Sequence, residues 1–158
     1  EPAAALCQRL AHSKALLIAQ QHPDAVIIGS DQVAVLGDQI LGKPGTAANA
    51  REQLALCSGH AVQFLTSLCV LHPNTEPQQV IEPFEVVFRQ LSDAEIARYV
   101  ELEQPLDCAG SFKWESLGIS LFERLRGNDP TALEGLPLIQ LTRMLRNVGL
   151  DPLTERPD

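Results

Sequence analysis

The sequence predicts an α/β fold in which helices flank a mixed β-sheet. Segments with apolar residues at helical spacing alternate along the chain with apolar segments rich in strand-forming residues. The clearest strand covers 61–71, which is nearly all apolar, as expected for a central strand covered on both faces. This interleaving of helices and strands is typical of the α/β class.

The composition limits the classes of function. A chain of 158 residues, 45% apolar and 20% charged, is typical of one globular domain with a sizeable core. A net charge of −8 argues against a basic surface for a nucleic acid polymer. A small anionic ligand is compatible with this charge if a few lysines converge and a divalent cation assists. No apolar run approaches the about 18 residues of a membrane span, and no secretory leader is present, so a cytoplasmic protein is expected.

The first elements are expected to differ in type. Apolar residues at helical spacing predict a helix from Pro2 to about Gln21. Short apolar runs at 26–28 and 33–36 predict two strand segments. The Gly37-Asp38 turn then leads into a third short strand at 39–41.

A helix and a hairpin are expected next. Thr46 is a typical N-cap for a helix over 47–57, and Gly59 stands where such a helix would end. The strand at 61–71 is followed by a polar turn with two prolines and by alternating residues over 80–89. This pattern predicts an antiparallel hairpin.

The last third of the chain is expected to contain two helices and a strand. Ser92 and Glu95 form a capping-box pattern for a helix that runs to about Glu103. Alternation over 118–125 predicts a strand. A final helix is expected from Pro137 to about Val148, and the tail after Pro152 is expected to be disordered.

The polar residues Ser30, Asp31 and Gln32 interrupt an otherwise apolar stretch. A carboxylate between buried strand segments is costly unless it is hydrogen-bonded, paired or bound to a cation. Asp31 is therefore the first candidate for chemistry. The residues taken alone favour a simpler interpretation, an ordinary polar turn between two strands.

Other charged residues have two interpretations each. Lys14 on the first helix and Lys43, held between glycine and proline, suit contacts to an anionic group, but a solvated surface lysine is the more frequent explanation for each. Trp114 lies between Lys113 and the carboxylate of Glu115. The three could form a pocket wall that stacks on a base and reads its edge, or an aromatic residue with two solvated neighbours.

The cysteines and histidines predict no metal or disulfide framework. The four cysteines are scattered in apolar surroundings without a C-x-x-C pair, so buried reduced thiols are expected. The four histidines show no ligand spacing and are expected to be structural or surface residues.

Several short blocks occur in order along the chain. They are Ser13-Lys14-Ala15, Ile28-Gly29-Ser30-Asp31-Gln32-Val33, Gly42-Lys43-Pro44, Ser58-Gly59, Glu82-Pro83-Phe84-Glu85-Val86, Cys108-Ala109-Gly110-Ser111-Phe112 and Gly135-Leu136-Pro137-Leu138. Each block is unspecific by itself, but the ordered set resembles the Maf family of nucleotide pyrophosphatases from Arg9 to Leu153. The resemblance implies a single domain over 1–153 with an elongated, twisted, mixed sheet like that of inosine-triphosphate pyrophosphatases, followed by a disordered tail at 154–158.

Two blocks are most similar to the branch of that family that hydrolyses 7-methyl-GTP. Ser30-Asp31-Gln32 stands where the branch that prefers dTTP and UTP typically carries Ala-Asp-Thr, and Ser111-Phe112-Lys113 with Glu115 stands where it carries Ala-Tyr-Gly with glutamine. The resemblance implies cleavage between the α and β phosphates, which yields the monophosphate and pyrophosphate and removes modified nucleotides.

The resemblance also implies roles for single residues. Asp31 would be the general base for water and a contact for Mg²⁺ or Mn²⁺; the phosphate ligands would be Lys14 and Lys43, and the base preference would depend on Gln32 and Glu115, with Lys113 nearby. Methylation at N7 makes guanine cationic. A carboxylate complements that charge and accepts from the N1 and amino donors, and Trp114 would stack on the ring.

The sequence departs from the family at three places. Ser116 stands where the family usually has glycine, and Trp114 is bulkier than the usual residue. The family begins with a strand and a Ser-x-Ser-Pro-x-Arg phosphate loop, followed by a second acidic residue, and these would precede Glu1. A molecule without them is expected to be inactive.

Two other functions are compatible with the sequence. One is a non-catalytic nucleotide-binding regulator of septum formation, a role associated with the family. The other is a pyrophosphatase that prefers dTTP, UTP or inosine triphosphate. A small nucleotide is the expected partner in each case, and a homodimer is open.

Overall fold

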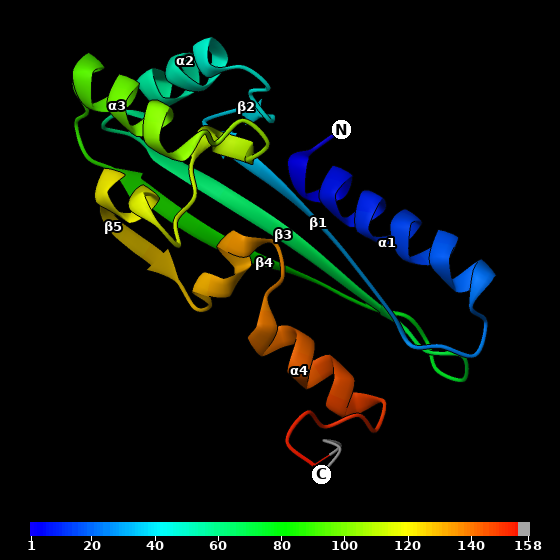
Figure 1. The fold of residues 1–158 in the computed structure, drawn as a ribbon. Helices are drawn as coiled ribbons and strands as arrows, with labels where there is room; N and C mark the ends of the chain where they lie inside the picture. The colour runs from blue at the N-terminus through cyan, green and yellow to red at the C-terminus, as the bar shows by residue number, and fades with distance from the viewer. Residues whose placement is uncertain (155–158) are drawn as a thin grey trace. The chain divides into compact units, whose positions relative to one another are not determined.

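Five strands form one sheet in the order β2-β1-β3-β4-β5 (Figure 1). The computed structural model describes residues 1–154. Its strands are β1 (Ile27–Leu36), β2 (Gln39–Leu41), β3 (Ala61–Leu71), β4 (Gln78–Phe88) and β5 (Phe122–Gly127). The α/β class with a sheet flanked by helices is confirmed. The predicted tail lies outside the described residues except for Thr154.

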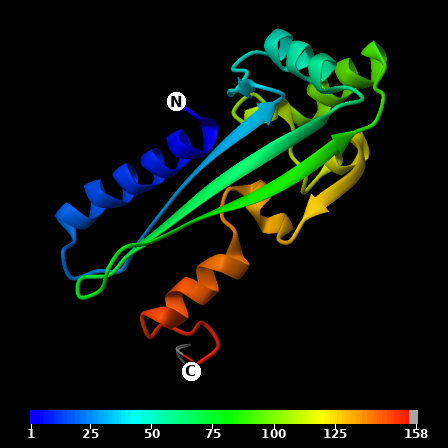
Figure 2. The same ribbon diagram turned by 180° about the vertical axis from the view of Figure 1, so that it is seen from behind.

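The strand directions are antiparallel where the sequence predicted a mixed sheet. β1 pairs antiparallel with β2, and β4 pairs antiparallel with β5. β3 runs opposite to both β1 and β4 (Figure 2). The short connections 37–38 and 72–77 join β1 to β2 and β3 to β4. Such short connections are too short for a parallel crossover, so these neighbours are antiparallel.

The predicted helices are confirmed as α1 (Ala3–Gln21), α2 (Ala47–Cys57), α3 (Asp93–Glu103) and α4 (Leu138–Asn147). The predicted caps are formed. The Thr46 side chain accepts from Asn49 N, and Ser92 and Glu95 form the reciprocal capping box. Short 3₁₀ helices complete the fold: η1 (Ala109–Ser111), η2 (Leu117–Leu121) and η3 (Pro130–Glu134).

Two strand predictions are corrected. The expected segments 26–28 and 33–36 belong, except for Val26, to the single strand β1, because Ser30, Asp31 and Gln32 remain extended. The expected strand 118–125 is instead η2 followed by β5. The Gly118 N–H bonds to the Lys113 carbonyl at 2.9 Å, which closes a turn and prevents an earlier start of the strand.

Contacts divide the chain into two compact units. The first contains Glu1–Gln32, Leu65–Pro83 and the described part of Asp129–Asp158; the second contains Val33–Phe64 and Phe84–Asn128. In the first unit, Cys69 of β3 packs with α1, whereas Leu68 and Val70 pack with α4. Neighbouring side chains of a strand point to opposite faces, so α1 and α4 cover opposite faces of this part of the sheet (Figure 1).

The second unit has an aromatic core. Edge-to-face contacts, with ring centroids 5.0 to 5.6 Å apart, join Phe64, Phe88, Phe112 and Phe122. α2 packs against α3 and η1, and α3 packs against η2. The core therefore anchors the segment around Phe112, on which the sequence predicted base-preference residues.

Three of the four cysteines are buried as expected, namely Cys7, Cys57 and Cys69, whereas Cys108 is only partly buried. Burial raises the pKa of Cys57 to about 12, so its thiol stays protonated at neutral pH. Among the described residues, no helix has the length and apolar character needed to cross a membrane.

Close approach of α1 to β1 depends on Gly29. A Cβ atom at this position would lie 2.6 Å from the Ala11 carbonyl oxygen and 2.8 Å from Ala15 Cβ. The obstacle at Ala11 is backbone, which cannot rotate away. Glycine is therefore required here for lack of space.

We expect Gly29→Ala to lower the free energy of unfolding by about 1–3 kcal/mol, because the added methyl group forces α1 away from β1. Chemical denaturation followed by circular dichroism measures the change. Gly42→Ala is the control, because a Cβ there meets no atom within 4 Å. Equal stabilities of the two variants would contradict the steric explanation.

Candidate active site

The first unit places Lys14 beside a closely packed helix face. Cys7, Ala11 and Ala15 follow one another at intervals of one helical turn and are 0%, 0% and 1% exposed. Their small side chains let α1 lie against β1 and β3. Lys14 directly precedes Ala15, so its long side chain starts at the edge of this contact and reaches the strand.

Lys14 and Asp31 form an ion pair. Lys14 Nζ lies 2.5 Å from Asp31 Oδ1, and the side chains are 58% and 14% exposed, respectively. The Cys7 thiol donates to the Asp31 carbonyl oxygen at 3.0 Å, which holds the backbone of this residue. The structure therefore brings two predicted site residues together and gives the mostly buried carboxylate the partner that its burial requires.

Asp31 is one acceptable ligand for a divalent cation. Carboxylate oxygen is the ligand type that Mg²⁺ and Mn²⁺ prefer. Within the described residues, no group of three or more acidic, histidine or cysteine side chains could hold a metal ion. Because Mg²⁺ is often bound by one or two carboxylates and substrate phosphates, Asp31 fits a cation that a phosphate ligand helps to hold.

Gln32 lies on the opposite face of β1 from Asp31, as strand alternation requires. Its Nε2 donates to Thr66 Oγ1 at 3.0 Å and to the Ala132 carbonyl at 2.7 Å. The Thr66 hydroxyl donates to the same carbonyl at 3.0 Å. The amino group of Gln32 is thus used to join β1, β3 and η3. Within residues 1–154, no hydrogen bond reaches its Oε1.

Asp129 supports η3, the 3₁₀ helix that Gln32 contacts, and was not predicted as a site residue. It is 1% exposed. Its Oδ1 accepts from the N–H and hydroxyl of Thr131, and its Oδ2 accepts from Ile139 N at 2.9 Å. Burial by itself would raise the pKa of Asp129, but these bonds outweigh burial and lower it. The carboxylate ties η3 to the start of α4 and so fixes the Ala132 carbonyl that Gln32 contacts.

Lys43 belongs to the second unit, in the loop between β2 and α2. It is exposed and lines a cavity of about 240 Å³ with side chains that include Asn49, Glu52 and Gln53. The Asn49 amide donates to the Pro44 carbonyl at 3.0 Å, and this bond braces the loop.

Lys113 and Glu115 lie in the second unit, between η1 and η2. The Lys113 N–H donates to the Tyr99 hydroxyl at 2.8 Å. Burial raises the pKa of Tyr99, which keeps that hydroxyl protonated. Trp114 is half-buried, and its indole N–H is buried without a partner among the described residues. Glu115 is exposed.

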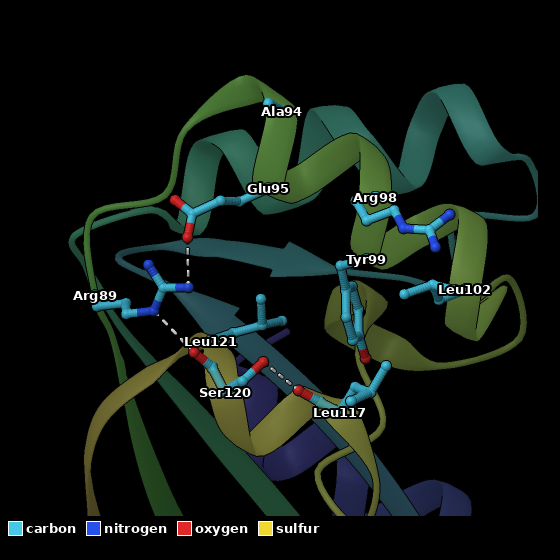
Figure 3. Close-up of a pocket in the computed structure, with 9 residues that line it drawn as sticks. All are labelled: Arg89, Ala94, Glu95, Arg98, Tyr99, Leu102, Leu117, Ser120 and Leu121. Atoms are coloured by element: carbon cyan, nitrogen blue, oxygen red, sulfur yellow. Dashed lines mark hydrogen bonds and ion pairs between the residues drawn. The ribbon is translucent and has the colours of Figure 1, made fainter.

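Another cavity, of about 440 Å³, lies between α3 and η2 (Figure 3). Its lining is mostly apolar and includes Leu102, Leu117 and Leu121. At one side, Arg89 donates to Glu95 at 2.7 Å and to the Ser120 carbonyl at 2.8 Å. The bond from Arg89 is the main cause that lowers the pKa of Glu95 to about 2. No predicted site residue lines this cavity.

The predicted site residues therefore fall into two sets. Lys14, Asp31 and Gln32 belong to the first unit, where Lys14 and Asp31 are in contact. Lys43, Lys113 and Glu115 belong to the second. The sequence analysis did not identify Asp129 as a support of η3. An aspartate shortly before a predicted helix is the signal that could have identified it.

The chain is a member of a known family. The family model described as Maf-like protein matches residues 1–148, so the chain belongs to the Maf-like proteins. This confirms the resemblance that the ordered sequence blocks carry.

Similar proteins have a more specific name. A protein from Alcanivorax borkumensis is 56% identical over 151 residues, which are 95% of this chain and 77% of that protein. One from Chromohalobacter salexigens is 57% identical over 150 residues, 94% of this chain and 78% of that protein. One from Pseudomonas putida is 55% identical over 151 residues, 95% of this chain and 79% of that protein. All three are named 7-methyl-GTP pyrophosphatase.

We expect Asp129→Asn to lower the free energy of unfolding at neutral pH by about 1–3 kcal/mol, because an amide nitrogen would face one of the present donors. The folded-state pKa lies below the ordinary value of 3.8, so the carboxylate stabilises the fold above that pH. This contribution is lost as the pH falls through the folded-state pKa.

Denaturation curves between about pH 7 and pH 2 test this expectation. The loss of stability in acid should be smaller for Asp129→Asn than for the unsubstituted protein. Asp38→Asn, at an exposed turn, is the control. Parallel pH profiles for the Asp129 variant and the unsubstituted protein would contradict the stabilising role.

Proposed function

We propose that the protein that contains this sequence hydrolyses the α–β phosphoanhydride of 7-methyl-GTP, giving 7-methyl-GMP and pyrophosphate. The observation that carries the proposal is the contact of Asp31 with Lys14 in a Maf-like protein whose relatives are named 7-methyl-GTP pyrophosphatases. A carboxylate held beside a flexible ammonium group provides both a base and a phosphate ligand.

In the proposed reaction, Asp31 removes a proton from water while the water oxygen attacks the α phosphorus. The bond from the α phosphorus to the bridging oxygen breaks, and pyrophosphate leaves with that electron pair. Lys14 is 58% exposed on a flexible stem, so its ammonium group can move from Asp31 to a phosphate oxygen when the nucleotide binds. This exchange leaves the carboxylate available to the water.

A divalent cation is part of the proposal. When bound, Mg²⁺ or Mn²⁺ would neutralise phosphate charge and polarise the phosphorus–oxygen bond. Asp31 is the residue that would hold it, with phosphate oxygens as further ligands. The expected cytoplasmic location and the homodimer also stay predictions.

Lys43, Glu115, Lys113 and Gln32 are the other residues proposed to bind the nucleotide. Lys43 would contact phosphate, which its exposed position on a braced loop permits. Glu115 would complement the cationic methylated guanine, with Lys113 nearby. Gln32 would contact the base through its Oε1, because its Nε2 already donates two hydrogen bonds inside the first unit.

We expect Asp31→Asn to reduce kcat for 7-methyl-GTP by a factor of about 10² to 10⁴, because an amide cannot accept the proton from water. Pyrophosphate release in the presence of Mg²⁺ or Mn²⁺ is the measurement. Asp24→Asn, at an exposed position of the same unit, should keep its activity. Equal turnover by Asp31→Asn and the unsubstituted protein would refute the role of Asp31 as base.

We expect Glu115→Gln to reduce the preference for 7-methyl-GTP over GTP by about tenfold, because the neutral amide loses the charge complement to the methylated ring. The ratio of kcat/KM values for the two nucleotides measures this preference. Glu76→Gln, in the exposed turn of the hairpin, is the matched control. A protein that prefers dTTP or UTP before any substitution would favour the alternative substrate class.

A further inference from the structure

Gln53 on α2 contacts two loops that carry predicted site residues of the second unit. Its Nε2 donates to the Gly42 carbonyl at 2.9 Å. Its Oε1 accepts from the Ser111 hydroxyl at 2.5 Å. One half-buried carboxamide therefore joins the loop before α2 to the segment around η1.

The first contact holds the loop of Lys43. Gly42 directly precedes Lys43, so the bond to its carbonyl restrains the peptide group from which the lysine projects. Two further bonds restrain the other end of the loop: Asn49 donates to the Pro44 carbonyl at 3.0 Å, and Gly45 N donates to the Leu106 carbonyl at 2.9 Å. Gln53 supplies the restraint on the side of the lysine.

The second contact holds a strained turn. Ser111 has a φ of +67° and is 0% exposed. The left-handed region is costly for a residue with a Cβ and persists only where its surroundings hold it. The Ser111 hydroxyl bond to Gln53 is one such restraint, and the next residue, Phe112, is fixed in the aromatic core.

This turn sets the direction of the chain that follows. Lys113 and Glu115 come two and four residues after Ser111, and the Lys113 N–H is bonded to Tyr99. A change of φ at Ser111 would redirect these residues relative to α2. The hydrogen bond from Ser111 to Gln53 therefore bears on Glu115 as well as on the loop of Lys43.

We propose that Gln53 is a positioning residue that sets Lys43 and the 111–115 segment for nucleotide binding. The inference rests on the proposed function, because it assumes that Lys43 contacts phosphate and Glu115 the base. Gln53 itself touches neither reacting group. Its Nε2 restrains the loop of Lys43, and its Oε1 restrains the 111–115 segment.

Steady-state kinetics of Gln53→Met tests the proposal. Methionine has a similar length but makes neither hydrogen bond. We expect the KM for 7-methyl-GTP to rise about tenfold and the preference over GTP to fall, with a smaller change in kcat. Gln78→Met is the matched control. Gln78 is also half-buried and also makes two side-chain bonds, to the Met144 carbonyl and Asn147, but it joins β4 to α4.

Two variants separate the effects of the two Gln53 hydrogen bonds, the first to the Gly42 carbonyl and the second from the Ser111 hydroxyl. Gln53→Glu keeps the acceptor for Ser111 but places a carboxylate against the Gly42 carbonyl, so the KM for both nucleotides should rise while the preference is retained. Ser111→Ala removes only the hydrogen bond from Ser111 to Gln53, so the preference for 7-methyl-GTP over GTP should fall. Kinetics of Gln53→Met that match those of Gln78→Met would overturn the proposal.

Amide hydrogen exchange provides a measurement that does not require activity. Gln53→Met should exchange faster than the unsubstituted protein over 41–46 and over 108–115, whereas Gln78→Met should not. If the unsubstituted protein releases no pyrophosphate from 7-methyl-GTP, the proposed function fails, and exchange alone decides whether Gln53 restrains both loops. Unchanged exchange in both segments would overturn the positioning role.

Discussion

The contact between α1 and β1 at Gly29 is the constraint on which the first unit depends. A side chain at Gly29 would meet the backbone of Ala11, so the helix can reach this distance only over a glycine. The small residues Ala11 and Ala15 complete the contact. Lys14 thereby reaches Asp31, and the Cys7 thiol reaches the Asp31 carbonyl. A packing requirement that involves no charge thus creates the charged pair.

Strand alternation then separates two adjacent polar residues by role. Asp31 points to α1 and its lysine, whereas Gln32 points to η3 and bonds the Ala132 carbonyl. Because the strand continues, each polar group is brought to partners far away in the sequence, and the buried carboxylate of Asp129 fixes the turn that receives Gln32.

The second unit holds its predicted site residues on irregular segments. Such segments have no ladder of backbone hydrogen bonds, so other contacts must fix them. Here the aromatic core fixes Phe112, and the Lys113 N–H donates to the Tyr99 hydroxyl. The Gln53 side chain joins Gly42 to Ser111. The exposed Lys43 and Glu115 are thus presented by backbone that buried or half-buried side chains restrain.

The sequence by itself determined the helices, the central hairpin and the family. Capping residues at Thr46 and Ser92 act within one helical turn, and strand alternation acts between neighbours, so both can be seen in a linear pattern. Only the tertiary structure decided that β1 is continuous, that Lys14 pairs with Asp31, and that Asp129 and Gln53 brace the segments beside them. These features depend on packing between separate elements and on hydrogen bonds from side chains to backbone groups. Neither can be predicted from the periodic pattern of residues within one helix or strand.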